Sequence, residues 1–285
     1  MTFLIFSNLF IAAAAALFTH ESYYLLGADP HLSPLLGLVF AATLVVYNLD
    51  RLSDAAEEDD VAVSERHEWI RRRRPLLWGL AGTAGVGVGV SLFFVPVDVV
   101  LALVPLGAFS LAYSLPVLWG RAGPYRLKDI AGLKIFVISI VWAGATAFLP
   151  AVEVFDNPFR LEVAALVAER GIFVFAIALP FDIRDMERDR ASEIWTIPLA
   201  LGVDRTRQMA YGATGLFALV CLLHYGVSIE GYAVPLLVSS AVTLALLAGA
   251  RRGRSEYYYL AHLDGMMALQ WALVAGWAYL WGVGT

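Results

Sequence analysis

The sequence has few charged residues and a single cysteine. Of its 285 residues, 16% are charged and 60% are hydrophobic, whereas a soluble domain usually carries about 25% charged residues. Cys221 lies within an apolar run, so the chain forms no internal disulfide and no metal–thiolate cluster, and we interpret this residue as a small core side chain. The net charge of −5 gives no reason to expect a nucleic-acid partner. These scarcities argue against an ordinary soluble domain and against a disulfide scaffold.

Long hydrophobic runs take up most of the chain, and the charged residues gather between them. A helix of about 20 apolar residues crosses a hydrocarbon core of about 30 Å, whereas a membrane β-barrel shows short alternating strands. The sequence therefore predicts an all-α, polytopic membrane protein that forms one domain over residues 1–285. We expect about nine spans. They lie near residues 3–20, 33–50, 77–96, 98–118, 128–149, 163–183, 208–227, 232–250 and 262–282.

Positively charged residues are concentrated in alternate loops. Of the 20 Lys and Arg, only Arg160 and Arg170 fall on the side opposite to the others. Because cytoplasmic loops are enriched in Lys and Arg, we expect a multi-pass protein of the cell (inner) membrane, surrounded by membrane lipids, with its N-terminus in the cytoplasm. The long charged loop 51–75 is either a solvated linker or a short surface helix over a cytoplasmic cavity.

Two of the apolar runs end in clusters of acidic residues. The first cluster consists of Asp50, Asp54 and Glu58. The second consists of Asp182, Asp185 and Asp189. If both segments are helical, a spacing of four residues places the acids of each cluster on one helix face, with Asp182 one turn earlier. Both clusters follow even-numbered spans, so we expect both at the cytoplasmic face.

Two carboxylate clusters at one membrane face would repel each other unless a cation offset them. Mg²⁺ takes oxygen ligands and is commonly shared between carboxylates and substrate phosphates, and no His or Cys pattern favours zinc. A diphosphate held by metal and carboxylates, with its lipid tail inside the bundle, would make a coherent site in which the cations stabilise the leaving diphosphate. The alternative is that both clusters are ordinary helix-end charges.

The second cluster and the residues after it resemble a known family. Asp182-x-x-Asp185-x-x-x-Asp189-Arg190, followed by Thr196-x-Pro198 and Leu201-Gly202, looks like the second aspartate motif of the UbiA superfamily of intramembrane prenyltransferases. Asp50-Arg51-x-x-Asp54 resembles the later part of its first motif, Asn-Asp-x-x-Asp-x-x-x-Asp. Tyr113-Ser114 and the basic residues up to Lys128 resemble its fourth loop.

The first motif departs from the family pattern. Val46 and Tyr47 stand where the family has Asn and Asp, and Asn48 is out of phase. Glu58 offers a replacement carboxylate one turn after Asp54. The arginine that follows the first motif in the family corresponds either to Arg74 in Arg74-Pro75 or to Arg66.

The resemblance implies a nine-helix bundle whose central cavity opens to the cytoplasmic side. In it, Mg²⁺ would link the aspartates to an isoprenyl diphosphate. The implied metal ligands are Asp50, Asp54, Glu58, Asp182, Asp185 and Asp189. The candidate catalytic residues are Asp50, Asp54, Asp185 and Asp189. The candidate diphosphate contacts are Arg51, Tyr113, Lys128, Lys134 and Arg184, although each cation could instead pair with a neighbouring acid.

The expected activity is Mg-dependent transfer of an isoprenyl group from a polyprenyl diphosphate to a lipophilic acceptor, aromatic or lipid, within the membrane. Two alternatives stay open: an intramembrane terpene cyclase that uses the same diphosphate site, and a non-catalytic lipid-binding relative. Asp264 lies near the cytoplasmic end of the last expected span. A charge at that depth indicates a functional residue, a helix cap, or a residue that packs against the mouth of the site.

Overall fold

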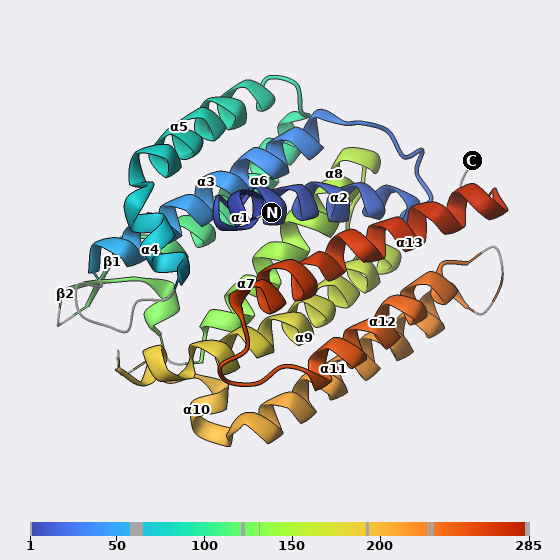
Figure 1. Cartoon of the computed structure of the whole chain (residues 1–285). Coiled ribbons are helices and arrows are strands. Elements are labelled where there is room, and N and C mark those ends of the chain that lie inside the picture. Colours follow the sequence, from blue (N-terminus) through green and yellow to red (C-terminus); the bar gives the residue numbers. More distant parts are fainter. Residues whose placement is uncertain are drawn as a thin grey trace.

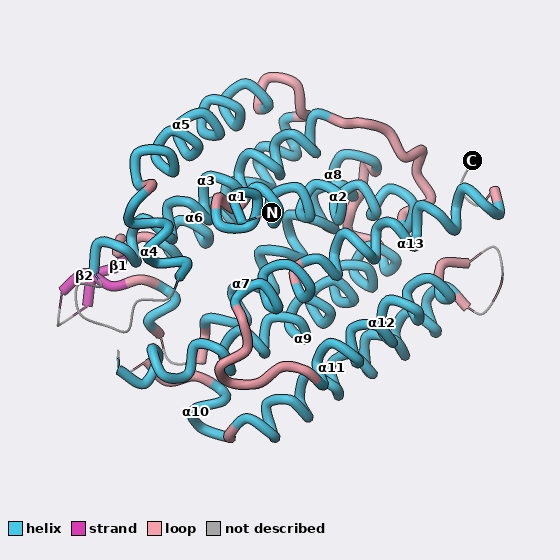
Figure 2. Tube along the Cα trace, viewed as in Figure 1, coloured by secondary structure: helices cyan, strands magenta, loops and turns pink. Residues whose placement is uncertain are grey.

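The computed structural model describes residues 2–57, 65–120, 123–130, 132–191, 194–226, 228 and 231–282. Within these ranges, long helices run side by side in a bundle (Figures 1 and 2). The first helices are α1 (Thr2–Phe6), α2 (Leu9–Leu25), α3 (Pro34–Glu57), α4 (Glu65–Arg72), α5 (Arg74–Ser91) and α6 (Val97–Ser114). The later ones are α7 (Lys134–Ala143), α8 (Leu149–Val154), α9 (Leu161–Ala191), α10 (Ile197–Leu201), α11 (Val203–Tyr225), α12 (Ala233–Ala248) and α13 (Gly265–Trp281).

Shorter elements connect the helices. A π-helical turn, η2 (Gly144–Phe148), joins α7 to α8, and another, η3 (Tyr258–Leu263), precedes α13. The strands β1 (Leu118–Gly120) and β2 (Gly123–Tyr125) pair antiparallel, and a 3₁₀ turn, η1 (Leu127–Asp129), follows them. The hairpin, α4 and α10 gather at one end of the bundle, at the left of Figure 1.

The prediction of an all-α membrane fold is confirmed. Each expected span overlaps a helical segment, and four segments of the described chain are long and apolar enough to cross a membrane. These are Pro34–Asp54, Val97–Ser114, Lys134–Val154 and Leu161–Ala191. A membrane core offers no water to backbone N–H and C=O groups, so a spanning chain must satisfy these groups internally, as a helix does.

The first expected span, residues 3–20, is interrupted. Asn8 takes a left-handed conformation with φ of 65° and separates α1 from α2. Asparagine tolerates this region because its short polar side chain can form local hydrogen bonds. Here Asn8 Nδ2 donates to Asn48 Oδ1 at 3.0 Å. The break therefore ties the N-terminal segment to α3 just before the first acidic cluster.

The fourth and fifth expected spans are shorter than the sequence suggests. The expected spans 98–118 and 128–149 reach into the connection that holds the hairpin, because α6 ends at Ser114 and α7 begins at Lys134. Pro116 lacks the N–H that would continue α6, and Gly123 has φ of 120°, which favours glycine. Lys128 therefore lies on the 3₁₀ turn η1 and not on a membrane helix.

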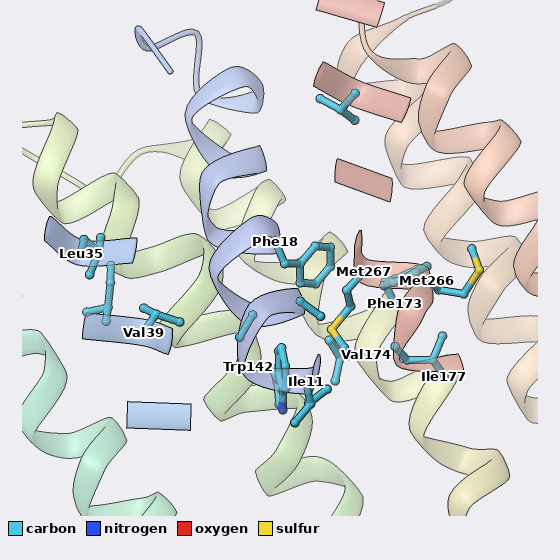
Figure 3. Close-up of a cluster of buried hydrophobic side chains, with 14 of the residues drawn as sticks. Ile11, Phe18, Leu35, Val39, Trp142, Phe173, Val174, Ile177, Met266 and Met267 are labelled. Atoms are coloured by element: carbon cyan, nitrogen blue, oxygen red, sulfur yellow. The ribbon is translucent and has the colours of Figure 1, made fainter. Parts of the chain in front are cut away.

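The core of the bundle forms where α2, α7, α9 and α13 meet. Figure 3 shows Phe18, Trp142, Phe173 and Met267 gathered there. Phe18 and Phe173 are fully buried, with ring centroids 5.9 Å apart. Between α3 and α5, a Cβ added to Gly87 would lie 3.4 Å from the Ala41 Cβ. Small residues permit this close approach, and in lipid such van der Waals packing is a main source of helix association.

A separate polar group, formed by Arg170, Glu21 and Ser22, is buried towards the N-terminal end of α9. Arg170 lies inside this helix, within the expected span 163–183, and is 3% exposed, so it is not one of the loop cations that set the orientation. Its Nη1 lies 3.4 Å from Glu21 Oε2, and its Nη2 donates to Ser22 Oγ at 2.9 Å. The pair forms because a charge buried in the bundle requires a partner. Arg170 is 12 residues from Asp182, or about 18 Å along the helix axis at 1.5 Å per residue.

Candidate active site

A cavity of about 820 Å³ lies inside the bundle, and the acidic ends of α3 and α9 both line it. Along α9, the lining changes from Val174 and Ile177 to the second acidic cluster. Along α3, it changes from Val46 to Asp50 and Asp54. α7 has the same polarity, because its lining begins at Lys134 and ends in apolar residues. The cavity therefore has a charged end and an apolar end.

The apolar end of the cavity belongs to the main core. Its lining there is Ile11, Trp142, Val174, Ile177 and Met267, which come from α2, α7, α9 and α13 (Figure 3). Trp142 is also hydrogen-bonded, because its Nε1 donates to the hydroxyl of Tyr47 at 3.1 Å. The structure thus places an aromatic pair between the apolar end and the first acidic cluster.

The second acidic cluster lines the cavity from the last turns of α9. Lys134 Nζ lies 2.9 Å from Asp182 Oδ1. Arg184 donates to both oxygens of Asp185, at 2.8 and 2.9 Å. Asp189 is 5% exposed, and its Oδ2 has no hydrogen-bond partner within the part of the chain that the structure describes. One carboxylate oxygen of this cluster is therefore buried and unpaired.

The first acidic cluster is held by cations from the hairpin connection and from its own helix. Lys128 Nζ donates to Asp50 Oδ1 at 2.7 Å and to Asp54 Oδ1 at 2.6 Å. Arg126 Nη1 donates to Asp54 Oδ1 at 3.3 Å. Arg51 Nη1 lies 3.9 Å from Asp50 Oδ2 and 3.8 Å from Asp54 Oδ2.

One of the predicted metal ligands, Glu58, lies outside the described residues. The other five predicted ligands all line the cavity. So do the five predicted diphosphate contacts, Arg51, Tyr113, Lys128, Lys134 and Arg184. Tyr113 lies beside Lys128, whose Nζ is 6.0 Å from the centre of its ring. The cavity thus brings together residues from α3, α6, η1, α7 and α9.

Three arginines lie together at the charged end. Arg51, Arg66 and Arg184 each have a buried N–H group without a hydrogen-bond acceptor among the described residues. Burial lowers the pKa of the Arg66 guanidinium well below its usual value, and the nearby positive charges of Arg51 and Arg184 lower it further. Buried donors normally have acceptors, so this arrangement is suited to an anion with several oxygen atoms.

The sequence alone did not assign Arg126 or Trp142 to the site. It left the roles of Arg66 and Asp264 undecided. The structure places all four in the cavity lining. Arg74, the other candidate for the family's arginine, does not line the cavity. Asp264 forms no side-chain hydrogen bond that caps α13, so the geometry does not support the helix-cap interpretation. No local pattern indicates Arg126 or Trp142, because both reach the site only through tertiary contacts.

The oxygen-rich lining is compatible with a hard divalent cation. Across the described ranges, no three His, Cys, Asp or Glu side chains are arranged so that they alone could hold a metal ion. Mg²⁺ usually takes only one or two carboxylates and completes its shell with water and substrate phosphate. The unpaired Asp189 Oδ2, with Asp182 and Asp185 on the same helix, fits that requirement.

This fold and this cavity define a class of protein: a helical membrane bundle with two aspartate clusters around one cavity. The chain belongs to the UbiA prenyltransferase family, whose model matches residues 70–258. Membership supports a prenyltransferase activity for this membrane-embedded chain. A search of curated proteins finds no match.

Solved structures with the same fold cover almost the whole chain. A UbiA homolog from Archaeoglobus fulgidus bound to GPP and Mg²⁺ has a TM-score of 0.66 at 13% identity, over 98% of this chain and 100% of that one. The apo structure of a UbiA homolog from Aeropyrum pernix K1 has a TM-score of 0.62 at 17% identity, with coverages of 94% and 97%. A digeranylgeranylglyceryl phosphate synthase has a TM-score of 0.59 at 13% identity, with 98% of each chain covered.

Proposed function

We propose that this protein transfers an isoprenyl group from a polyprenyl diphosphate to a lipophilic acceptor within the membrane, with Mg²⁺ as cofactor. One observation carries the proposal: the acidic clusters of α3 and α9, although distant in sequence, line the charged end of one cavity whose other end is apolar. A lipid diphosphate has the same division into a charged head and an apolar tail. The homologue bound to GPP and Mg²⁺ supports this choice of ligand.

The diphosphate would lie against the arginines of the charged end. The unpaired N–H groups of Arg51, Arg66 and Arg184 provide donors for phosphate oxygens, and charge-assisted hydrogen bonds are about twice as strong as neutral ones. Mg²⁺, when bound near Asp182, Asp185 and Asp189, would neutralise charge on the diphosphate. Donors that are already in place cost no reorganisation when negative charge grows on the leaving group.

The isoprenyl tail would extend from the aspartates towards Trp142, Val174 and Ile177. The C–O bond breaks, its electron pair leaves with the diphosphate, and an allylic cation forms on the tail. Tyr113 and Tyr47 line the cavity beside the charged end, and the faces of aromatic rings stabilise cations. A nucleophilic carbon or oxygen of the acceptor then bonds to the allylic carbon and loses its proton.

The proposal includes an orientation. The charge asymmetry of the loops favours a cytoplasmic N-terminus and a cavity that opens at the cytoplasmic leaflet of the cell membrane. Arg170 is buried within α9, so only Arg160 remains as an exposed cation on the opposite side. A cysteine introduced at Arg71 in a Cys221→Ala background should react with a membrane-impermeant reagent only in inverted vesicles. Labelling in intact cells would contradict the orientation.

The activity is tested with purified protein, Mg²⁺ and a panel of isoprenyl diphosphates, with and without aromatic acceptors. Release of pyrophosphate only when acceptor is present supports transfer. Release without acceptor, together with a hydrocarbon product, would replace transfer by cyclisation. No release and no EDTA-sensitive binding would indicate a non-catalytic lipid-binding relative.

Variants of α9 test the role of the second cluster. Asp185→Ala and Asp189→Ala should each abolish turnover while the protein stays folded, because each removes a carboxylate that lines the cavity. Glu187→Ala is the matched control, because Glu187 lies on the same helix but is exposed and outside the lining. Full activity of both aspartate variants would contradict the proposed site.

A further inference from the structure

The two acidic clusters differ in how completely cations of the protein contact their carboxylates. Where the first motif of the family has an aspartate, this chain has Tyr47, whose hydroxyl accepts a hydrogen bond from Trp142 at 3.1 Å. The adjacent Asn48 is fully buried and bonds to Asn8 and to the Leu44 carbonyl, so it does not line the cavity. Within the described residues of α3, Asp50 and Asp54 are therefore the carboxylates that reach the cavity.

A single ammonium group bridges these two carboxylates. Lys128 Nζ lies 2.7 Å from Asp50 Oδ1 and 2.6 Å from Asp54 Oδ1. The other oxygen of each carboxylate faces Arg51, at 3.9 and 3.8 Å. A divalent cation that bridged the two Oδ1 atoms would have to replace Lys128, and one that bridged the two Oδ2 atoms would lie beside the Arg51 guanidinium. The lysine side chain is 11% exposed, which shields the contact from water.

Within the described residues, cations and carboxylates of the first cluster form one connected group. Arg126 contacts both Asp54 and Asp129, so the connected group contains three carboxylates, Asp50, Asp54 and Asp129. It also contains three cations, Arg51, Arg126 and Lys128. Among the described residues, these contacts join three negative and three positive charges, and Arg126 has a further interaction beyond them. A divalent cation bound between Asp50 and Asp54 would have to displace this buried ion pair.

The second cluster retains an available ligand. Lys134 contacts only one oxygen of Asp182, and Arg184 pairs with Asp185. The Asp189 Oδ2 is buried and has no hydrogen-bond partner among the described residues. A buried unpaired carboxylate oxygen is costly unless a ligand satisfies it. Both clusters line one cavity, but among the described residues only the second has a buried carboxylate oxygen without a hydrogen-bond partner.

We propose that Lys128 serves as a built-in cation of the first cluster, so that the protein binds one divalent metal ion, at the second cluster, rather than two. This inference rests on the proposed diphosphate site. In it, the ammonium of Lys128 stays between Asp50 and Asp54 when the diphosphate binds, and it supplies one of the positive charges that the site needs. The lysine can remain there because η1 holds it at the base of the hairpin.

The stoichiometry can be counted directly with Mn²⁺ as the probe. Purified protein in lipid nanodiscs is titrated with Mn²⁺ in the presence of inorganic pyrophosphate, and free Mn²⁺ is measured by electron paramagnetic resonance. Pyrophosphate without protein corrects for metal bound to the anion alone. The variants are Lys128→Gln, which removes the ammonium, and Tyr47→Asp/Lys128→Gln, which also adds a third carboxylate. Arg71→Gln, at an exposed position of α4, controls for loss of a positive charge.

We expect one bound Mn²⁺ per chain for the wild type and for Arg71→Gln. We expect two per chain for Lys128→Gln and for the double variant, with a dipolar Mn–Mn coupling in their spectra. Thermal melts identify any variant that fails to fold, and the wild-type count alone already tests the claim. Two Mn²⁺ in the wild type, or a single one in both folded Lys128 variants, would overturn the built-in cation and leave the transferase proposal intact. If the wild type bound no metal ion at all, this would contradict both the built-in cation and the transferase proposal.

Discussion

Replacing Arg170 by Met should strongly destabilise the bundle. The Arg170 side chain is 2% exposed, and its partner Glu21 is fully buried. The substitution removes the contact of 3.4 Å with Glu21 and the hydrogen bond of 2.9 Å to Ser22. It also removes a cation–π contact, because the guanidinium carbon lies 3.5 Å from the centre of the Phe18 ring.

The dominant loss is electrostatic. Met keeps much of the apolar volume of Arg, so the cavity that forms is small, but Glu21 is left buried without its cation. Breaking a buried ion pair in this way costs about 3–5 kcal/mol, whereas total stabilities are about 5–15 kcal/mol. The expected loss is therefore a large part of the free energy of unfolding. Arg160→Met is the control, because Arg160 is exposed and also stacks on a phenylalanine; it should cost less than about 1 kcal/mol.

A double variant separates charge from packing. If the penalty comes from the unpaired carboxylate, Glu21→Gln combined with Arg170→Met should recover most of the loss, because replacing both members of a buried pair is often nearly neutral. The free energy of unfolding can be measured by circular dichroism in mixed micelles as the fraction of denaturing detergent increases. A cost below about 1 kcal/mol for Arg170→Met, or a double variant no more stable than the single one, would refute the reasoning.

Two further substitutions test the cavity and its support. Trp142→Ala enlarges the apolar end of the cavity, so it should shift preference towards longer isoprenyl diphosphates; competition assays with two chain lengths would measure this, and an unchanged ratio would mean that Trp142 does not limit the tail. Gly132→Ala should destabilise the protein by about 1–3 kcal/mol, because Gly132 has φ of 72° and an added Cβ would lie 2.7 Å from the Trp195 ring; an unchanged melting temperature would contradict this.

The sequence by itself determined the fold class and the two acidic helix ends. Hydropathy determines the fold class because a chain in lipid must satisfy its backbone polar groups internally. Long apolar runs meet this requirement by forming helices. The spacing of Asp182, Asp185 and Asp189 is local, so the helical period alone places them together. The same holds for Asp50 and Asp54. The structure places all five aspartates in the lining of one cavity.

Only the tertiary structure decided which cations meet which acids. Lys128 lies 74 residues from Asp54, and nothing in the spacing of either residue indicates that they are in contact. Arg170 falls within the expected span 163–183, but only the structure shows that it pairs with Glu21, which is 149 residues away. The choice of Arg66 over Arg74 for the cavity also depends on how α4 packs beside α3. Such pairings depend on how the helices pack and on the path of the loops between them. A local pattern of residues contains no information on either.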